Sequence, residues 1–192
     1  MNNRLVLIAL FAVFFAPVLV AVLLHSEWVS WQAAPEKAHG ELVDPVVPLG
    51  AFRLPDAGGN TRTLSDLAGR WQLVHARPDG CGADCVETLS LMHNIRLAQD
   101  RHRDEVGLVL LSRDVLDERT RARIRKVDPS LVAFDGEAGE ALLQRFPRLA
   151  PGTFYIVDPE ANIMERFGPG AELNGIRKDL DRLLTWTVRE QQ

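Results

Sequence analysis

The stretch "WQLVHARPDGCGADCVETL" (residues 71–89) decides how this sequence is interpreted. It begins with a short apolar run, residues 71–76, that is typical of a β-strand, and it leads into a helix predicted from about residue 84 to 101. Between them lie Cys81 and Cys85, the only two cysteines of the chain. The pair therefore falls at the carboxyl end of a strand and the amino end of a helix, where open α/β sheets place their chemistry.

Strands and helices alternate around this stretch. We predict a first hairpin over residues 51–64, strands at 71–76, 106–112 and 130–134, a late hairpin with strands 153–157 and 162–167, and helices at 84–101, 117–127, 137–146 and 172–186. This order predicts an α/β fold in which helices cover both faces of a mixed central sheet.

The N-terminus predicts a membrane anchor. Residues 5–24 form an uncharged apolar run long enough to span the ~30 Å hydrocarbon core, and Arg4 before it favours a cytoplasmic N-terminus over residues 1–4. A cleaved signal peptide is the alternative, but its apolar run is shorter, ~7–15 residues, and needs a nearby small-residue cleavage site. We expect a single-pass protein of the bacterial inner membrane.

The remaining organisation follows from the anchor. Residues 25–47 carry several prolines and no helical or strand period, which predicts a periplasmic tether. Residues 48–188 then form the folded periplasmic domain. The modest net charge of −4 argues against a general nucleic-acid-binding protein, which is usually basic.

Three roles compete for the cysteine pair: a structural disulfide, a redox pair and a metal site. The N-terminus of a helix favours a thiolate, so we expect Cys81 to have a lowered pKa and to be the more reactive thiol. Two cysteines four residues apart can form and break a disulfide with little movement, and two thiolates also suit Cu(I). A purely structural bond is disfavoured because so short a loop restricts the unfolded chain only slightly.

Two blocks of the sequence resemble the Sco/SenC type of membrane-anchored thioredoxin-fold protein. They are "WQLVHARPDGCGADCVETL" and "TFYIVDPEANIMERF" (residues 153–167), and the tail resembles a bacterial subgroup associated with cytochrome c oxidase assembly. The resemblance covers roughly residues 48–185. It implies a thioredoxin-like fold and a role in assembling the oxidase, by delivering Cu(I) or by reducing the cysteines of its copper site.

The resemblance also implies a copper site that this sequence does not complete. In the Sco type, two cysteines and a histidine just before the late strand bind copper, and that histidine position falls on Ala150 here. No histidine follows His102. His75, six residues before Cys81, is the candidate substitute, although a lone histidine on an apolar strand is more often structural.

These observations lead to one functional hypothesis and two alternatives. The first is thiol–disulfide exchange, in which Cys81 attacks and Cys85 resolves, with a cytochrome c oxidase subunit or assembly factor and a periplasmic thiol–disulfide protein as partners. The second is a Cu(I) chaperone that uses Cys81, Cys85 and His75. The third is a non-catalytic assembly scaffold with a structural disulfide.

Overall fold

The structure is a computed structural model that describes residues 4, 13–16 and 38–190. Apart from residues 13–16, the anchor predicted over residues 5–24 lies outside the described part. In the part of the chain that is described, no helix is both long and apolar enough to cross a membrane. Residues 38–192 form one compact unit.

Eight strands and five α-helices make up this unit in the described residues. The strands are β1 (Glu41–Pro48), β2 (Arg53–Pro55), β3 (Thr61–Thr63), β4 (Trp71–Arg77), β5 (Val106–Ser112), β6 (Val132–Phe134), β7 (Thr153–Val157) and β8 (Asn162–Phe167). The helices are α2 (Leu64–Leu67), α3 (Ala83–Leu97), α4 (Glu118–Val127), α5 (Gly136–Leu143) and α6 (Leu173–Glu190), with a 3₁₀ helix η1 (Asp100–Glu105).

Six strands form the central sheet in the order β1-β8-β7-β4-β5-β6. β4, β5 and β6 run parallel, whereas β7 pairs antiparallel with both β4 and β8, and β1 pairs antiparallel with β8. The sheet is therefore mixed, as predicted, and the cysteine loop follows one of its two innermost strands. β2 and β3 form the predicted first hairpin as a separate two-stranded sheet.

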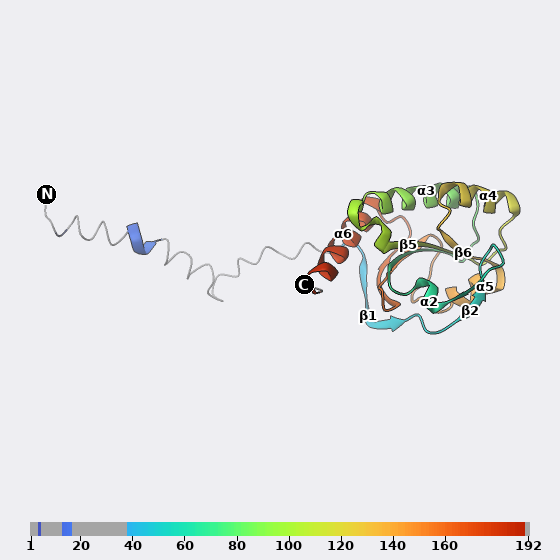
Figure 1. The fold of residues 1–192 in the computed structure, drawn as a ribbon, viewed down its shortest axis with the longest axis horizontal. Helices are drawn as coiled ribbons and strands as arrows, with labels where there is room; N and C mark the ends of the chain where they lie inside the picture. The colour runs from blue at the N-terminus through green and yellow to red at the C-terminus, as the bar shows by residue number, and fades with distance from the viewer. Residues whose placement is uncertain (1–3, 5–12, 17–37, 191–192) are drawn as a thin grey trace. The chain divides into compact units, whose positions relative to one another are not determined.

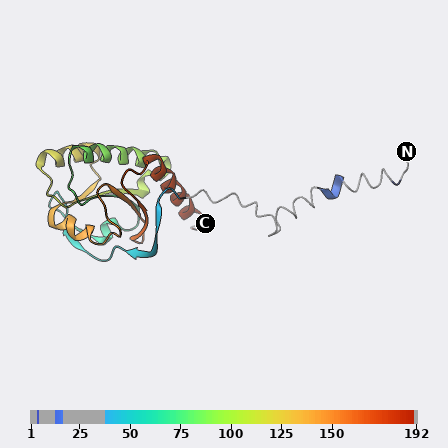
Figure 2. The same ribbon diagram turned by 180° about the vertical axis from the view of Figure 1, so that it is seen from behind.

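The helices cover both faces of the sheet (Figures 1 and 2). α3, α4 and α6 lie on one face, and α2 and α5 on the other. Each face has its own apolar core, because every residue of β4 and β5 is buried. Side chains of a strand alternate between the two sides, so successive residues of β4 enter different cores.

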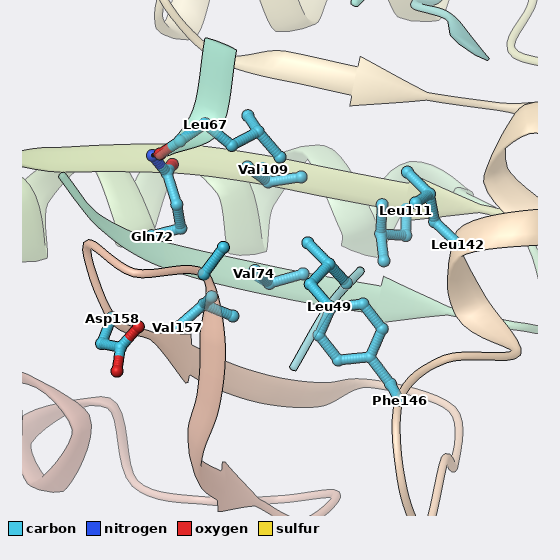
Figure 3. Close-up of a pocket in the computed structure, with 11 residues that line it drawn as sticks. Leu49, Leu67, Gln72, Val74, Val109, Leu111, Leu142, Phe146, Val157 and Asp158 are labelled. Carbon is cyan, nitrogen blue, oxygen red and sulfur yellow. Dashed lines mark hydrogen bonds between the residues drawn. The ribbon is translucent and has the colours of Figure 1, made fainter. Parts of the chain in front are cut away.

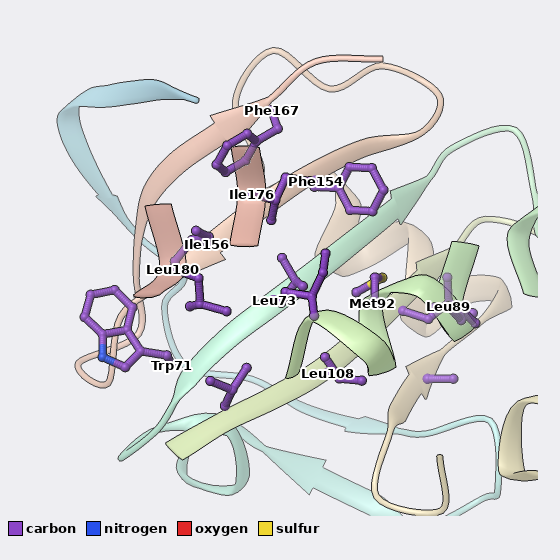
Figure 4. Close-up of a cluster of buried hydrophobic side chains, with 14 of the residues drawn as sticks. Trp71, Leu73, Leu89, Met92, Leu108, Phe154, Ile156, Phe167, Ile176 and Leu180 are labelled. Atoms are coloured by element: carbon purple, nitrogen blue, oxygen red, sulfur yellow. The ribbon is translucent and has the colours of Figure 1, made fainter. Parts of the chain in front are cut away.

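The core beneath α3 and α6 surrounds the start of the site (Figure 4). Leu73 of β4 and Leu108 of β5 meet Leu89 and Met92 of α3 there, and all are fully buried or nearly so. The last helix presents an apolar stripe to this core, formed by residues that belong to the core or pack against it: Leu173, Ile176, Leu180, Leu183 and Leu184. α3 is thus held rigidly over β4.

The opposite core contains a small enclosed cavity (Figure 3). Mainly apolar side chains line it, including Leu49, Val74, Val109 and Phe146. Its volume is about 10 Å³, which is room for roughly one water molecule. It is a packing gap rather than a ligand site.

The predicted tether is wrong at its end. Residues 41–47, assigned to the tether, belong to strand β1, and the compact unit begins at residue 38 rather than 48. Pro45 and Pro48 suggested irregular chain, but β1 is an edge strand, where proline removes no necessary hydrogen bond. Val43 and Leu49 are buried in the second core and hold this edge in place.

Candidate functional site

Cys81 and Cys85 form a disulfide at the carboxyl end of β4, with their Cα atoms 5.2 Å apart. Cys85 is fully buried in the core beneath α3, whereas Cys81 is partly exposed and only packs against that core. Of the two cysteines, Cys81 is therefore the one that an incoming thiol can approach, because Cys85 is closed off from solvent. This asymmetry supports the predicted division into an attacking and a resolving cysteine.

The helix begins slightly differently from the prediction. Gly82 is the N-cap of α3, so Cys85 lies in the first turn and Cys81 lies just outside the helix. Gly82 has no side chain that could cap the first turn, whereas the Asp84 carboxylate interacts with the backbone N–H groups of Asp84 and Cys85, which helps to lower its pKa. Because Cys81 directly precedes the N-cap, it lies beside the positive end of the helix dipole. A negative charge on Cys81 would be stabilised there.

Arg77, the last residue of β4, organises the loop. Its guanidinium donates two hydrogen bonds of 3.0 Å to the carboxylate of Asp79 and one of 2.7 Å to Asp84 Oδ2. The side chain is only 10% exposed. Its backbone oxygen accepts hydrogen bonds from the N–H groups of Gly80 and Arg113, both at 3.1 Å. One residue thus ties together the strand end, the loop and the first turn of α3.

The contacts of Arg77 argue against a direct electrostatic effect of this residue on the cysteines. The hydrogen bond from Arg77 lowers the pKa of Asp84, so that carboxylate is ionised at neutral pH. Arg77 forms ion pairs with Asp79 and Asp84, and these two carboxylates neutralise the effect of its positive charge on the nearby cysteines. We infer that Arg77 fixes the shape of the loop and that the end of the helix favours the thiolate.

His75 lies in the same strand, two residues before Arg77 and on the same face. Its ring stacks on Phe154 with 4.5 Å between centroids and is 1% exposed. Burial, followed by the charge of Arg77, lowers its pKa to about 4, and the negative charges of Asp79 and Asp84 oppose this shift only in part. Among the described residues, neither ring nitrogen has a hydrogen-bond partner. His75 is therefore a neutral imidazole inside the core that also contains Cys85.

The described residues do not complete a three-ligand copper site. They contain no group of three or more His, Cys, Asp or Glu side chains that could hold a metal ion. Ala150, where the resemblance places a histidine, uses its backbone oxygen to accept hydrogen bonds from Thr153. The other described histidines pair with carboxylates: His39 with Asp179, His93 with Asp128 and His102 with Glu105. The two cysteine sulfurs remain the donors that suit Cu(I).

A second buried cluster, which was not predicted from the sequence, lies where the compact unit begins. Glu165 of β8 is 1% exposed, and burial together with the charge of Asp179 raises its pKa to about 7. Asp179 of α6 accepts hydrogen bonds from the backbone N–H groups of His39, at 2.5 Å, and Gly40, at 3.0 Å. The sequence did carry a signal, because Glu165 occupies an inward position of the alternating strand "NIMERF".

Comparison with known families identifies the fold. A family model described as "Transmembrane-like, thioredoxin-like, C-terminal domain" matches residues 71–187, which is more than half of the chain. A comparison with curated proteins found no significant match to the sequence.

Solved structures agree with this assignment. Yeast Sco1 with copper bound superposes with a TM-score of 0.61 at 16% identity, covering 74% of this chain and 95% of the other. BsSco, a member of the Sco family of cytochrome c oxidase assembly proteins with a disulfide switch, gives 0.55 at 13%, covering 73% and 95%. The thioredoxin domain of a thiol-disulfide oxidoreductase from Bacteroides vulgatus gives 0.54 at 18%, covering 71% and 95%. The predicted thioredoxin-like fold with a mixed central sheet, and the likeness to Sco/SenC proteins, are confirmed at the level of the fold.

Proposed function

This chain belongs to the transmembrane-like, thioredoxin-like C-terminal domain family, and on that premise we propose that it aids cytochrome c oxidase assembly by thiol–disulfide exchange through Cys81 and Cys85. One observation carries the proposal: the two cysteines are bonded at the end of β4, and Cys81 is partly exposed whereas Cys85 is buried. A redox pair needs this asymmetry, because the partner must engage a single sulfur.

The reaction begins from the reduced form. The Cys81 thiolate attacks one sulfur of a disulfide in the partner, a mixed disulfide forms, and the partner's other sulfur leaves as a thiolate that takes a proton from water. Cys85, once deprotonated, attacks the sulfur of Cys81. The Cys81–Cys85 bond closes and the second partner thiolate is released. Two electrons have passed to the partner, and a periplasmic thiol reductant must restore the dithiol.

The proposed partners and location go together. The oxidase is a membrane protein, and BsSco, which shares this fold, belongs to a family that assembles it. We place the domain in the bacterial periplasm, anchored in the inner membrane by residues 5–24, where a cysteine pair can cycle. In intact spheroplasts, externally added protease should digest the domain. Protection until the membrane is lysed would contradict this orientation.

A trapping experiment tests the exchange reaction. In Cys85→Ser, Cys81 can still attack the partner, but no second thiol is present to resolve the mixed disulfide. A mixed disulfide with an oxidase subunit or assembly factor should therefore accumulate. Cys81→Ser is the matched control, since its remaining thiol is buried, and it should trap at least tenfold less. Equal trapping by both variants would refute the assigned order, and trapping by neither would refute exchange.

The reduction potential separates exchange from a structural bond. For the full chain in mild detergent, we expect the pair to equilibrate with glutathione-type buffers, above about −300 mV. A value well below that limit would indicate a structural disulfide and favour an assembly scaffold.

Copper binding is the second candidate, favoured by the fold shared with copper-bound yeast Sco1. Cu(I) would be cargo held by the sulfurs of Cys81 and Cys85, because the described residues supply no three-ligand site. Anaerobic competitive titration of the reduced protein, beside a Cys81→Ser, Cys85→Ser double variant, tests this. One equivalent bound only by the native protein would support copper handling, and His75→Ala would then show whether the imidazole contributes. Equal binding by both proteins would refute it.

A further inference from the structure

A cavity unrelated to the cysteine loop lies between α4 and the β2–β3 hairpin. Its volume is about 150 Å³. The hairpin turn covers it and is fixed to the sheet edge by a 2.7 Å hydrogen bond from the Ala57 N–H to the Ala133 oxygen. Since pockets for drug-sized ligands measure ~300–1,000 Å³, this one suits a ligand of only several non-hydrogen atoms.

The cavity has an apolar floor. Leu116 and Ile124 are buried there, and Leu131 and Ala133 complete it from β6 and the loop before it. A ligand that fills this space gains by removing its own apolar surface from water. The floor therefore favours a hydrocarbon portion over a compact hydrated ion.

Arginines from two elements line the rest of the cavity. Arg121 and Arg125 stand four residues apart on α4, so they share the face that also carries Ile124. Arg62 approaches from the hairpin. The arginines of α4 therefore differ in position: Arg121 and Arg125 line the cavity, whereas Arg119 and Arg123 are exposed on the other sides of the helix.

The neighbouring carboxylates leave donors of these arginines unused. Asp56 already accepts hydrogen bonds from the N–H groups of Gly58 and Asn60 and from Arg62 Nε, all at 2.8–2.9 Å. Within the described part of the chain, the side chain of Arg62 pairs only through its Nε, with Asp56, which leaves its two terminal nitrogens available. Asp56, in contrast, has little accepting capacity left for a cationic ligand.

The two arginines of α4 are also incompletely paired. Arg121 contacts Asp135 only at 3.4 Å and Glu118 only at 3.9 Å, and its Nε has no partner among the described residues. Arg125 uses one nitrogen, 2.7 Å from the largely exposed Glu118. Guanidinium groups bind carboxylates through two parallel N–H donors, so these side chains can still accept an anionic group.

We propose that this cavity binds a small organic carboxylate, with its short hydrocarbon chain on the Leu116–Ile124 floor and its carboxylate between Arg62 and Arg121. The site is independent of the thiol chemistry. The unpaired N–H donors of the arginines favour an anionic group, and the apolar floor favours a ligand with a hydrocarbon chain.

Titration of the full protein in mild detergent with sodium pentanoate tests the proposal, using NMR signals of the arginine Nε–H groups and of the Gly58 amide. We expect saturable shifts, at least tenfold weaker binding of pentylammonium, and weaker binding of inorganic phosphate, which has no apolar chain. Arg62→Gln should weaken binding at least fivefold, and Arg119→Gln, on the exposed side of the same helix, should not.

The outcomes are separable. Arg125→Gln changes a largely exposed side chain, so it should fold normally and still reduce pentanoate affinity severalfold even if Arg62→Gln disturbs the hairpin. Non-saturable shifts, equal binding of the ammonium analogue, or unchanged affinity in both variants would overturn the proposal. Phosphate binding as tight as pentanoate binding would refute the use of the apolar floor.

Discussion

His75 and Glu165 should give the protein two opposed pH dependences that cancel in the native sequence. Both side chains are 1% exposed, and both have a pKa moved toward the neutral form, to about 4 for the histidine and about 7 for the glutamate. The unfolded chain would titrate near the ordinary values, 6.5 and 4.5. We predict that replacing either residue exposes the pH dependence of the other.

The signs follow from which state binds the proton. Between pH 6.5 and 4 the unfolded chain protonates His75 more readily than the native protein, so its contribution to stability is lost as pH falls through this window. Native Glu165 holds a proton that the unfolded chain has released, so its contribution is lost as pH rises from 4.5 to 7. At ~1.4 kcal/mol for each pH unit of difference, each effect amounts to about 2 kcal/mol between pH 4.5 and 7.

Urea unfolding of the oxidised protein at pH 4.5, 5.5, 6.25 and 7 measures these contributions. The native protein should show a nearly level free energy of unfolding. His75→Leu, a change of similar volume, should become less stable by about 2 kcal/mol on going from pH 4.5 to 7, and Glu165→Gln should become more stable by a similar amount. The hydrogen-bonded Asp56, Asp84 and Asp128 have lowered pKa values and titrate mainly below this range.

The slopes rather than the absolute stabilities decide the matter, because either substitution also changes packing. If the His75→Leu curve runs parallel to that of the native protein, the imidazole is not held neutral by burial. If the Glu165→Gln curve is parallel, the glutamate is already ionised in the native state and its cluster with Asp179 has been misread.

Three further substitutions and one control substitution test local parts of the fold by urea unfolding at pH 7. Arg77→Gln leaves Asp79 and Asp84 without their partner and should lower the free energy of unfolding by about 1–3 kcal/mol. If the cysteine loop loosens on reduction, most of this loss should disappear in the reduced protein. Gly139→Ala brings a Cβ to 2.0 Å from the Ser112 oxygen, so it should cost about 3 kcal/mol or prevent folding, whereas Gly168→Ala, with 3.7 Å of room, should be nearly neutral. Tyr155→Phe removes a 2.7 Å, partly buried hydrogen bond to the backbone oxygen of Pro147 and should cost about 1 kcal/mol. Unchanged stability in any of the first, second or fourth variants would contradict the contact it removes or crowds.

Local patterns were enough to place most elements. The uninterrupted apolar run of β4 and the apolar stripe of α6, which repeats every 3.6 residues, are signals that depend only on neighbouring residues. The pattern failed at β1, because proline carries the same local signal in a tether and at the edge of a sheet. Only pairing with β8 distinguishes the two.

The site divides in the same way. The sequence alone determined that Cys81 and Cys85 follow a buried strand and open a helix, since both elements are local and the cysteines lie between them. The tertiary structure decided which sulfur is exposed and that His75 stacks on Phe154.

Contacts between residues far apart in the chain could not be predicted from the sequence, for a physical reason. Residues 39 and 179 are 140 positions apart, yet they meet because β1 closes the sheet edge beneath α6. In the same way, the hairpin and α4 enclose the arginine-lined cavity only when both pack against β6. The periodicity of a sequence shows which face of an element is apolar. Which polar groups of different elements meet depends instead on the order of the strands within the sheet.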